Sequence, residues 1–143
     1  MHGLIVGGED PKRQAYAQEL RAKVKQLGLD DEITFTGNRS DIWDVYAVSD
    51  LVLSLSTKPE SFGRAVLEAL SLGVPVAGYD HGGVGEILAT LYPQGRVPLG
   101  DQAALFSISN QLLDEVGAIK ENTLFLRSDM LERNVALYEN VCM

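Results

Sequence analysis

The chain has 143 residues, of which 45% are hydrophobic, and a formal net charge of −8. This length and composition are typical of one soluble globular domain. The acidic balance argues against non-specific nucleic-acid binding, because such binding needs a basic surface. No apolar run approaches the roughly 20 residues of a membrane-spanning helix, and the N-terminus lacks the pattern of a signal peptide.

A single cysteine, Cys142, lies beside the C-terminus, so the sequence predicts no internal disulfide. This cysteine usage is typical of a reducing compartment, and we expect a cytoplasmic protein. The sequence contains no internal repeat, low-complexity tract or linker. We therefore expect a single domain over residues 1–143.

The first part of the sequence alternates short apolar runs with helical patterns. Leu4–Val6 is followed by Gly7–Gly8, which predicts a short buried strand that ends in a tight turn. Pro11 is typical of the first turn of a helix, and Gly28 predicts the C-terminal end of that helix. Residues 32–37 are predicted to form the next strand, with apolar side chains on one face.

A short helix is predicted next, with Ser40 or Asp41 as its N-cap and with Ile42, Val45 and Tyr46 on its apolar side. The remaining strands are predicted at residues 50–56, 74–79 and 95–99, and the remaining helices at residues 63–73, 83–90, 101–116 and 128–141. Strands alternate with helices throughout. This order predicts an α/β fold, a Rossmann-like doubly wound parallel sheet that helices cover on both faces.

In such folds, ligands bind beyond the carboxyl ends of the strands. The loops predicted at these ends are residues 7–8, 37–39, 56–63 and 78–83. We therefore expect the functional residues to gather on one rim of the sheet. His81 lies in the last of these loops and is interpreted as a solvated residue. The sequence shows no zinc-ligand spacing, no P-loop and no Gly-x-Ser-x-Gly elbow.

The segment Glu60–Gly63 comes directly before a predicted helix. Because the backbone enters the helix at Gly63, the N–H groups of residues 63–66 are predicted to point out of its first turn and to form an anion site with the helix dipole. Glu68 lies more than one turn further along and is placed to hold a ribose diol, since a carboxylate accepts two hydroxyl donors at once. Alternatively, Glu60 only complements the helix dipole and Glu68 is a solvated helix residue.

Four segments in this order carry a family resemblance: LIVGG, ITFTG, DLVLSLS and ESFGRAVLEALSLGVPVAGYDHGGVGEIL. They resemble the nucleotide-sugar-binding C-terminal half of GT-B glycosyltransferases, in particular the retaining glycosyltransferase family 4. The likeness is most specific at Glu60 and Glu68, which match the E-x7-E motif of that family, and at Gly82–Gly83. It implies the donor-binding domain of a retaining glycosyltransferase, which transfers a sugar from a nucleoside-diphosphate sugar to an acceptor.

The resemblance also implies roles for single residues. Glu60 is expected to be the catalytic residue and to touch the hydroxyl groups of the donor sugar, and Glu68 is expected to hold the ribose. The backbone donors expected near the sugar are those of Phe62, Gly63 and Arg64, and those expected near the diphosphate are Ala65 and Val66. The expected neighbours of the nucleotide are Gly7 and Gly8 at its closest approach and Gly37, Asn38 and Arg39 at the edge of its base. No metal ion and no other cofactor is expected, because the helix and basic residues meet the phosphate charge.

Members of that family also carry an N-terminal acceptor-binding domain and, before the strand that corresponds to Leu4–Val6, a further strand with a basic loop. We therefore expect a domain without its first strand, which does not transfer sugar alone and which self-associates through exposed sheet edges. Two alternatives stay open at this point. One is a non-catalytic module that binds a nucleotide or a sugar phosphate, and the other is an interaction domain without a ligand.

Overall fold

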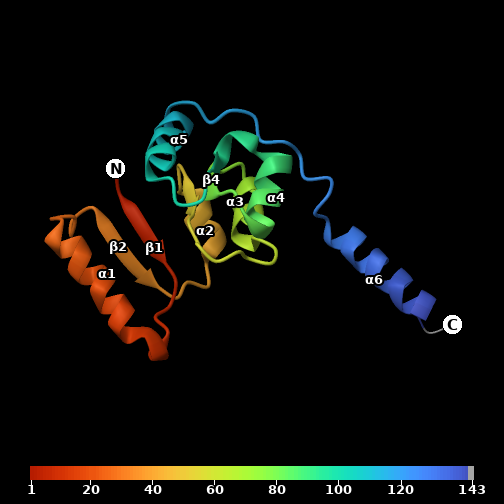
Figure 1. The fold of residues 1–143 in the computed structure, drawn as a ribbon, viewed down its shortest axis with the longest axis horizontal. Helices are drawn as coiled ribbons and strands as arrows, with labels where there is room; N and C mark the ends of the chain where they lie inside the picture. Colours follow the sequence, from red (N-terminus) through yellow and green to blue (C-terminus); the bar gives the residue numbers. More distant parts are fainter. Residues whose placement is uncertain (142–143) are drawn as a thin grey trace. The chain divides into compact units, whose positions relative to one another are not determined.

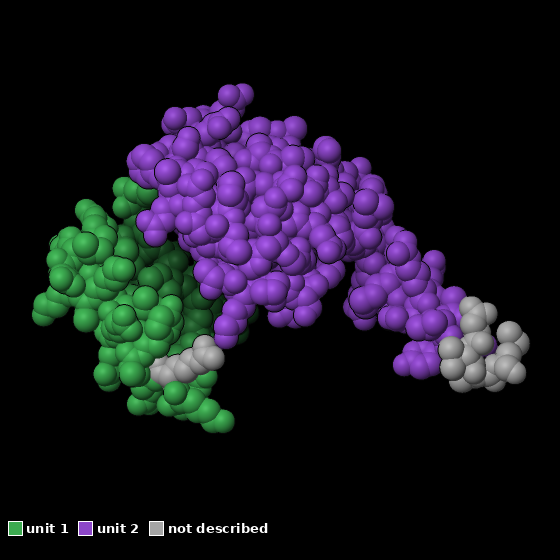
Figure 2. Space-filling view, viewed as in Figure 1, with its two compact units in different colours: residues 1–45 green, residues 46–143 purple. Residues whose placement is uncertain are grey.

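The computed structural model describes residues 1–141 and divides into two compact units, residues 1–45 and the chain from Tyr46 onward (Figure 2). The border between the units falls within α2 (Ile42–Ala47). Cys142 lies outside the described residues. In each unit parallel strands alternate with helices (Figure 1), so the predicted α/β, Rossmann-like fold class is confirmed. The described strands form two separate sheets, however, and not the single sheet with one rim that the sequence predicted.

The first unit consists of a two-stranded parallel sheet and one long helix. Its elements in chain order are β1 (Gly3–Val6), η1 (Pro11–Arg13), α1 (Gln14–Gln26) and β2 (Ile33–Gly37). The Asp10 side chain caps η1 by accepting a backbone N–H two residues further on, and Pro11 holds the first position of that turn. The guanidinium of Arg21 lies 4.5 Å from the ring centroid of Phe35, which fixes α1 on β2.

The second unit contains a three-stranded parallel sheet in the order β3–β4–β5. Its elements after α2 are β3 (Val52–Ser54), α3 (Arg64–Ser71), β4 (Val76–Tyr79), α4 (Gly82–Leu91), η2 (Pro93–Gly95), β5 (Arg96–Val97), α5 (Gln102–Asp114) and α6 (Arg127–Val141). All four residues of β4 are buried, as expected for the central strand of a covered sheet.

The core of the second unit forms where α3 and α4 meet β4. Val66, Ala69 and Leu70 are buried together because they lie three or four residues apart, on one face of α3. α4 contributes Ile87 and Leu88, which are almost completely buried. This apolar contact holds both helices against the strand.

Each predicted strand is present; β1 is one residue longer than the sequence pattern indicated and the other strands are shorter. The prediction that the first strand is buried is wrong, since Leu4 and Ile5 are exposed in the two-stranded sheet. Asp101 caps α5 as predicted, because its side chain accepts the N–H of Ala104 at 2.9 Å. The prediction that this helix reaches Val116 is wrong, since α5 ends at Asp114. The physical reason is that the Val116 carbonyl oxygen accepts a hydrogen bond from the Tyr92 hydroxyl, which fixes the chain outside the helix.

α6 begins at Arg127, one residue before the predicted start. The apolar side chains that the pattern placed along it, Leu131, Val135 and Tyr138, are exposed. None of the helices that the structure describes combines the length and the apolar character that a bilayer crossing requires.

Tyr92→Phe is expected to lower the free energy of unfolding by about 1 kcal/mol near neutral pH, because the variant keeps the buried ring but loses the bond to Val116. Burial raises the pKa of the Tyr92 hydroxyl above that of an unfolded tyrosine. The folded chain therefore holds this proton more tightly than the unfolded chain. The resulting stability is fully present below about pH 10 and is lost as the pH rises through the folded value.

Urea denaturation followed by circular dichroism measures this effect. The difference in unfolding free energy between the wild type and Tyr92→Phe should be smaller at about pH 11 than at about pH 8. The same difference at both pH values would contradict a buried, hydrogen-bonded hydroxyl.

Candidate functional site

The loop Glu60–Gly63 leads directly into α3. Gly63 occupies the N-cap position with φ 78° and ψ 43°, in the left-handed region that favours glycine. A Cβ atom at this position would lie 3.0 Å from the backbone nitrogen of Val84. The backbone conformation and the close neighbour both select glycine, and the chain enters α3 through a sharp, fixed turn.

The first turn of α3 presents backbone donors in a partly different set from the predicted one. The N–H groups of Val66 and Leu67 both donate to the Gly63 carbonyl oxygen, at 3.1 and 3.3 Å. The prediction of a free donor at Val66 is therefore wrong, because the first turn closes with an i→i+3 bond. Within residues 1–141, the N–H groups of Gly63, Arg64 and Ala65 form no hydrogen bond. These three donors remain available at the positive end of the helix dipole.

The first turn of α4 packs directly against this loop. The Gly83 N–H donates to the Glu60 carbonyl oxygen at 2.9 Å. A Cβ atom on Gly83 would lie 2.4 Å from the carbonyl carbon of Phe62, closer than real Cβ atoms come to heavy atoms outside their own stretch of chain. Together with the contact between Gly63 and Val84, this places the beginnings of α3 and α4 in contact.

His81 joins the chain after β3 to the beginning of α4. Its Nε2 atom lies 2.7 Å from the carbonyl oxygen of Ser56. Since a carbonyl oxygen only accepts, Nε2 carries the proton in this contact. The interpretation of His81 as a solvated loop residue misses this hydrogen bond, which ties the ring to the backbone of another segment. The partner is a backbone atom 25 residues away, which residue types alone do not indicate.

The two motif carboxylates have different surroundings. Glu60 is exposed, and within the described part of the chain its carboxylate forms no ion pair or hydrogen bond. The side chain of Glu68 is only 24% exposed, and its Oε1 atom lies 3.4 Å from Nε of Arg64. Its Oε2 atom accepts a hydrogen bond from the Tyr46 hydroxyl at 3.3 Å. Glu68 is thus a partly buried, paired carboxylate rather than a solvated helix residue.

Tyr46 is a residue of this site that the sequence pattern placed only on the apolar side of a helix. Burial, and then the negative charge of Glu68, raise the pKa of its hydroxyl. The hydroxyl therefore stays protonated and remains a hydrogen-bond donor at neutral pH.

The predicted neighbours of the nucleotide lie in the first unit. The Gly7 N–H donates to the Gly37 carbonyl oxygen at 3.1 Å, and a Cβ atom on Gly8 would lie 2.3 Å from Oδ1 of Asn38. These four residues are therefore brought together, as the sequence predicted. Arg39 Nε donates to Asp41 Oδ1 at 2.7 Å, and this hydrogen bond lowers the pKa of the Asp41 carboxyl. The Arg39 charge is thus already matched by a carboxylate.

Ion pairing limits the basic groups that an anionic ligand meets. Four arginines are each paired with a carboxylate: Arg21 with Glu9, Arg39 with Asp41, Arg64 with Glu68 and Arg96 with Asp80. Among residues 1–141, no group of three or more His, Cys, Asp or Glu side chains is arranged to hold a metal ion. An anion at the beginning of α3 would be bound mainly by backbone donors.

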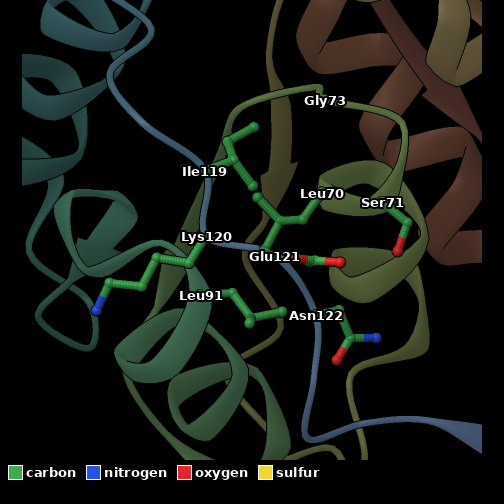
Figure 3. A pocket seen from close by; sticks show the side chains of 8 residues that line it. All are labelled: Leu70, Ser71, Gly73, Leu91, Ile119, Lys120, Glu121 and Asn122. Carbon is green, nitrogen blue, oxygen red and sulfur yellow. The ribbon is translucent and has the colours of Figure 1, made fainter.

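Two cavities border α3. One of about 410 Å³ lies between the C-terminal ends of α3 and α4 and residues 119–122 (Figure 3), and no predicted site residue lines it. The other, of about 490 Å³, is lined by Phe62 and Leu67 and by side chains from residues 124–134. The rings of Phe62 and Phe125 meet edge to face beside it, with centroids 6.2 Å apart. Phe62 thus connects the motif loop to the chain that leads into α6.

Comparison with known protein families identifies the segment that carries this geometry. A family model described as "Glycosyl transferases group 1" matches residues 2–115. The chain is 33% identical to N-acetyl-alpha-D-glucosaminyl L-malate synthase of Bacillus anthracis, over 92% of this chain and 30% of that protein. It is 31% identical to 2-deoxystreptamine N-acetyl-D-glucosaminyltransferase of Streptomyces fradiae, over 91% of this chain and 30% of that protein. The chain therefore spans less than a third of the length of these curated relatives.

The fold is also similar to that of solved structures of Alr3699/HepE from Anabaena. The complex of that protein with UDP aligns with a TM-score of 0.74 and 31% identity, over 81% of this chain and 32% of that chain. Its complex with UDP-glucose aligns with the same TM-score of 0.74 and 32% identity, over 80% of this chain and 32% of that chain.

Gly83→Ala is expected to destabilise the second unit and to displace the Glu60–Gly63 loop, because the new Cβ atom meets the Phe62 backbone. Whether the variant is more or less stable than the wild type distinguishes two effects. Glycine-to-alanine in a helix ordinarily adds up to about 1 kcal/mol of stability, whereas overpacking costs about 1–3 kcal/mol.

Chemical denaturation measures the free energy of unfolding of the variant. Glu86→Ala, at an exposed position of the same helix, is the matched control and should change stability by no more than about 0.5 kcal/mol. Stability of Gly83→Ala equal to or above that of the wild type would rule out the close contact.

Proposed function

Because this chain belongs to the family described as glycosyl transferases group 1, we propose that it binds a nucleoside-diphosphate sugar and forms the donor side of a glycosyl transfer. The observation that carries the proposal is the junction of α3 and α4, where free backbone donors and the partly buried Glu68 occur in one motif segment. The names of the relatives, a synthase and a glycosyltransferase, and the UDP bound to a similar fold support the same proposal.

The diphosphate is proposed to bind at the beginning of α3. The N–H groups of Gly63, Arg64 and Ala65 supply the donors, and the helix dipole adds a partial positive charge. Val66 contributes through its place in the turn rather than through its N–H, which is used inside the helix. Since backbone groups meet the phosphate charge, the proposed binding needs no metal ion.

The two carboxylates are proposed to divide the rest of the donor between them. Glu68 accepts the ribose hydroxyls, because a partly buried carboxylate with remaining lone pairs is suited to a diol. Glu60 contacts the donor sugar as the catalytic residue. Its carboxylate is exposed, while its backbone is fixed by the hydrogen bond from Gly83.

The transfer itself is proposed to retain the anomeric configuration of the sugar, as the sequence resemblance implies. Residues 1–143 would act together as one donor-binding domain. Because the chain spans about 30% of its curated relatives, we propose that transfer requires an additional acceptor-binding part and that the chain alone is inactive.

UDP is expected to bind this chain more tightly than uridine, because only the diphosphate engages the donors at the beginning of α3. Isothermal titration calorimetry with UDP, GDP and ADP, each beside its nucleoside, measures the contribution of the phosphates and identifies the preferred base. Equal affinities for nucleoside and diphosphate would exclude the phosphate assignment.

Glu68→Gln is expected to weaken the binding of UDP by about tenfold or more, because hydrogen bonds to a charged group contribute about 1.5–3 kcal/mol. 2′-DeoxyUDP should bind the wild type less tightly than UDP and should show a much smaller penalty in the variant. Glu86→Gln, an exposed carboxylate on α4, is the control and should bind both ligands as the wild type does. The same 2′-deoxy penalty in the wild type and in Glu68→Gln would show that Glu68 does not bind the ribose.

A further inference from the structure

Tyr46 places a buried hydroxyl group against the carboxylate of Glu68. The tyrosine is only 6% exposed, and its hydroxyl donates to Glu68 Oε2 at 3.3 Å. Hydrogen bonds in ligand-free sites are often long and shorten when a ligand is bound. The contact joins α2 to α3 across 22 residues of sequence, so it orients a motif side chain from a different element.

The two oxygens of Glu68 are held in unequal ways. Oε2 faces the buried Tyr46, whereas Oε1 faces Arg64, whose side chain is 84% exposed. An ion pair with an exposed, long side chain is weakly held, and water or a ligand can replace it. Oε1 is therefore the oxygen that an incoming hydroxyl group can reach, while Oε2 is fixed from the interior.

The hydroxyl of Tyr46 is suited to this fixed role. Because burial and the charge of Glu68 raise its pKa, it remains a donor across the neutral range. A carboxylate has about four lone-pair positions, so one bond from Tyr46 leaves room for the ribose hydroxyls. The carboxylate is thereby held in one orientation and still has lone pairs that can accept further hydrogen bonds.

We propose that Tyr46 is a positioning residue, which holds the Glu68 carboxylate through Oε2 so that Oε1 faces the ribose of the donor nucleotide. Arg64 yields Oε1 when the ribose binds. This inference rests on the proposed function. Tyr46 acts only through Glu68 and does not touch the ligand.

The test compares Tyr46→Phe with the wild type by calorimetry, with UDP and 2′-deoxyUDP as ligands. Tyr46→Phe keeps the ring and is expected to bind UDP about three- to tenfold more weakly, the range that one net hydrogen bond represents. Its 2′-deoxy penalty should be smaller than that of the wild type. In the Glu68→Gln background, Tyr46→Phe should cause no further change in that penalty.

Tyr92→Phe is the matched control, because it also removes a buried, hydrogen-bonded hydroxyl from the second unit but one that does not contact Glu68. It should retain the wild-type affinity and 2′-deoxy penalty. If UDP binds the wild type and Tyr46→Phe behaves as Tyr92→Phe does, the positioning role is overturned while the proposed function stands. If the wild type does not distinguish UDP from uridine, the proposed function fails and the role of Tyr46 in ribose binding fails with it.

A second measurement covers the case in which Tyr46→Phe does not fold. Carbon NMR of the tyrosine rings follows the ionisation of Tyr46 in the wild type and in Glu68→Gln. The pKa of Tyr46 should fall in Glu68→Gln, because the negative charge that opposes ionisation is removed. An unchanged pKa would show that the two side chains do not interact and would overturn the proposal.

Discussion

The backbone contact between the first turn of α4 and the Glu60–Gly63 loop is the constraint on which the rest of the second unit's site depends. Gly83 lies so close to Phe62 that a side chain cannot be inserted, and its N–H holds the Glu60 carbonyl oxygen. This contact fixes the position of the loop where the chain enters α3. The direction of the free N–H groups follows from it, and so does the face on which Glu68 stands one turn later.

If an acidic chain is to bind an anion, it needs hydrogen-bond donors that are not already paired with a carboxylate. The net charge is −8, and four arginines are each paired with a carboxylate, so the charge of these arginines is already partly balanced within the chain. Backbone N–H groups at a helix start avoid this difficulty, because they are neutral donors with a fixed direction. The two motif glutamates also differ in whether their charge is paired within the chain. Glu68 is held close to other groups, whereas Glu60 stands where its charge is solvated.

The sequence predicted the order of strands and helices well because burial leaves a pattern of apolar residues in the chain. β4 is an unbroken apolar run, and the buried residues of α3 recur at helical spacing. The motif between Glu60 and Glu68 can also be read from the sequence, since it lies in consecutive residues. The role of Tyr46 was not visible, because its hydroxyl meets a carboxylate 22 residues away and its ring fits the apolar pattern of α2. Val66 and Val116 were misjudged for a similar reason: single hydrogen bonds to Gly63 and from Tyr92 decide their surroundings.

The left-handed turn at Gly63 would make the entropic cost of binding the proposed donor unequal between its phosphates and its sugar. Fixing the backbone of one residue costs about 1–2 kcal/mol, and folding has already fixed the backbone of the residues that we propose to face the phosphates. Glu68 is likewise ordered before a ligand arrives, through its contacts with Tyr46 and Arg64. The exposed side chain of Glu60 is not, so a sugar that engages it must also restrict its rotamers. The nucleotide would thus meet a preorganised surface, and the free energy that distinguishes one sugar from another would include the ordering of a single glutamate.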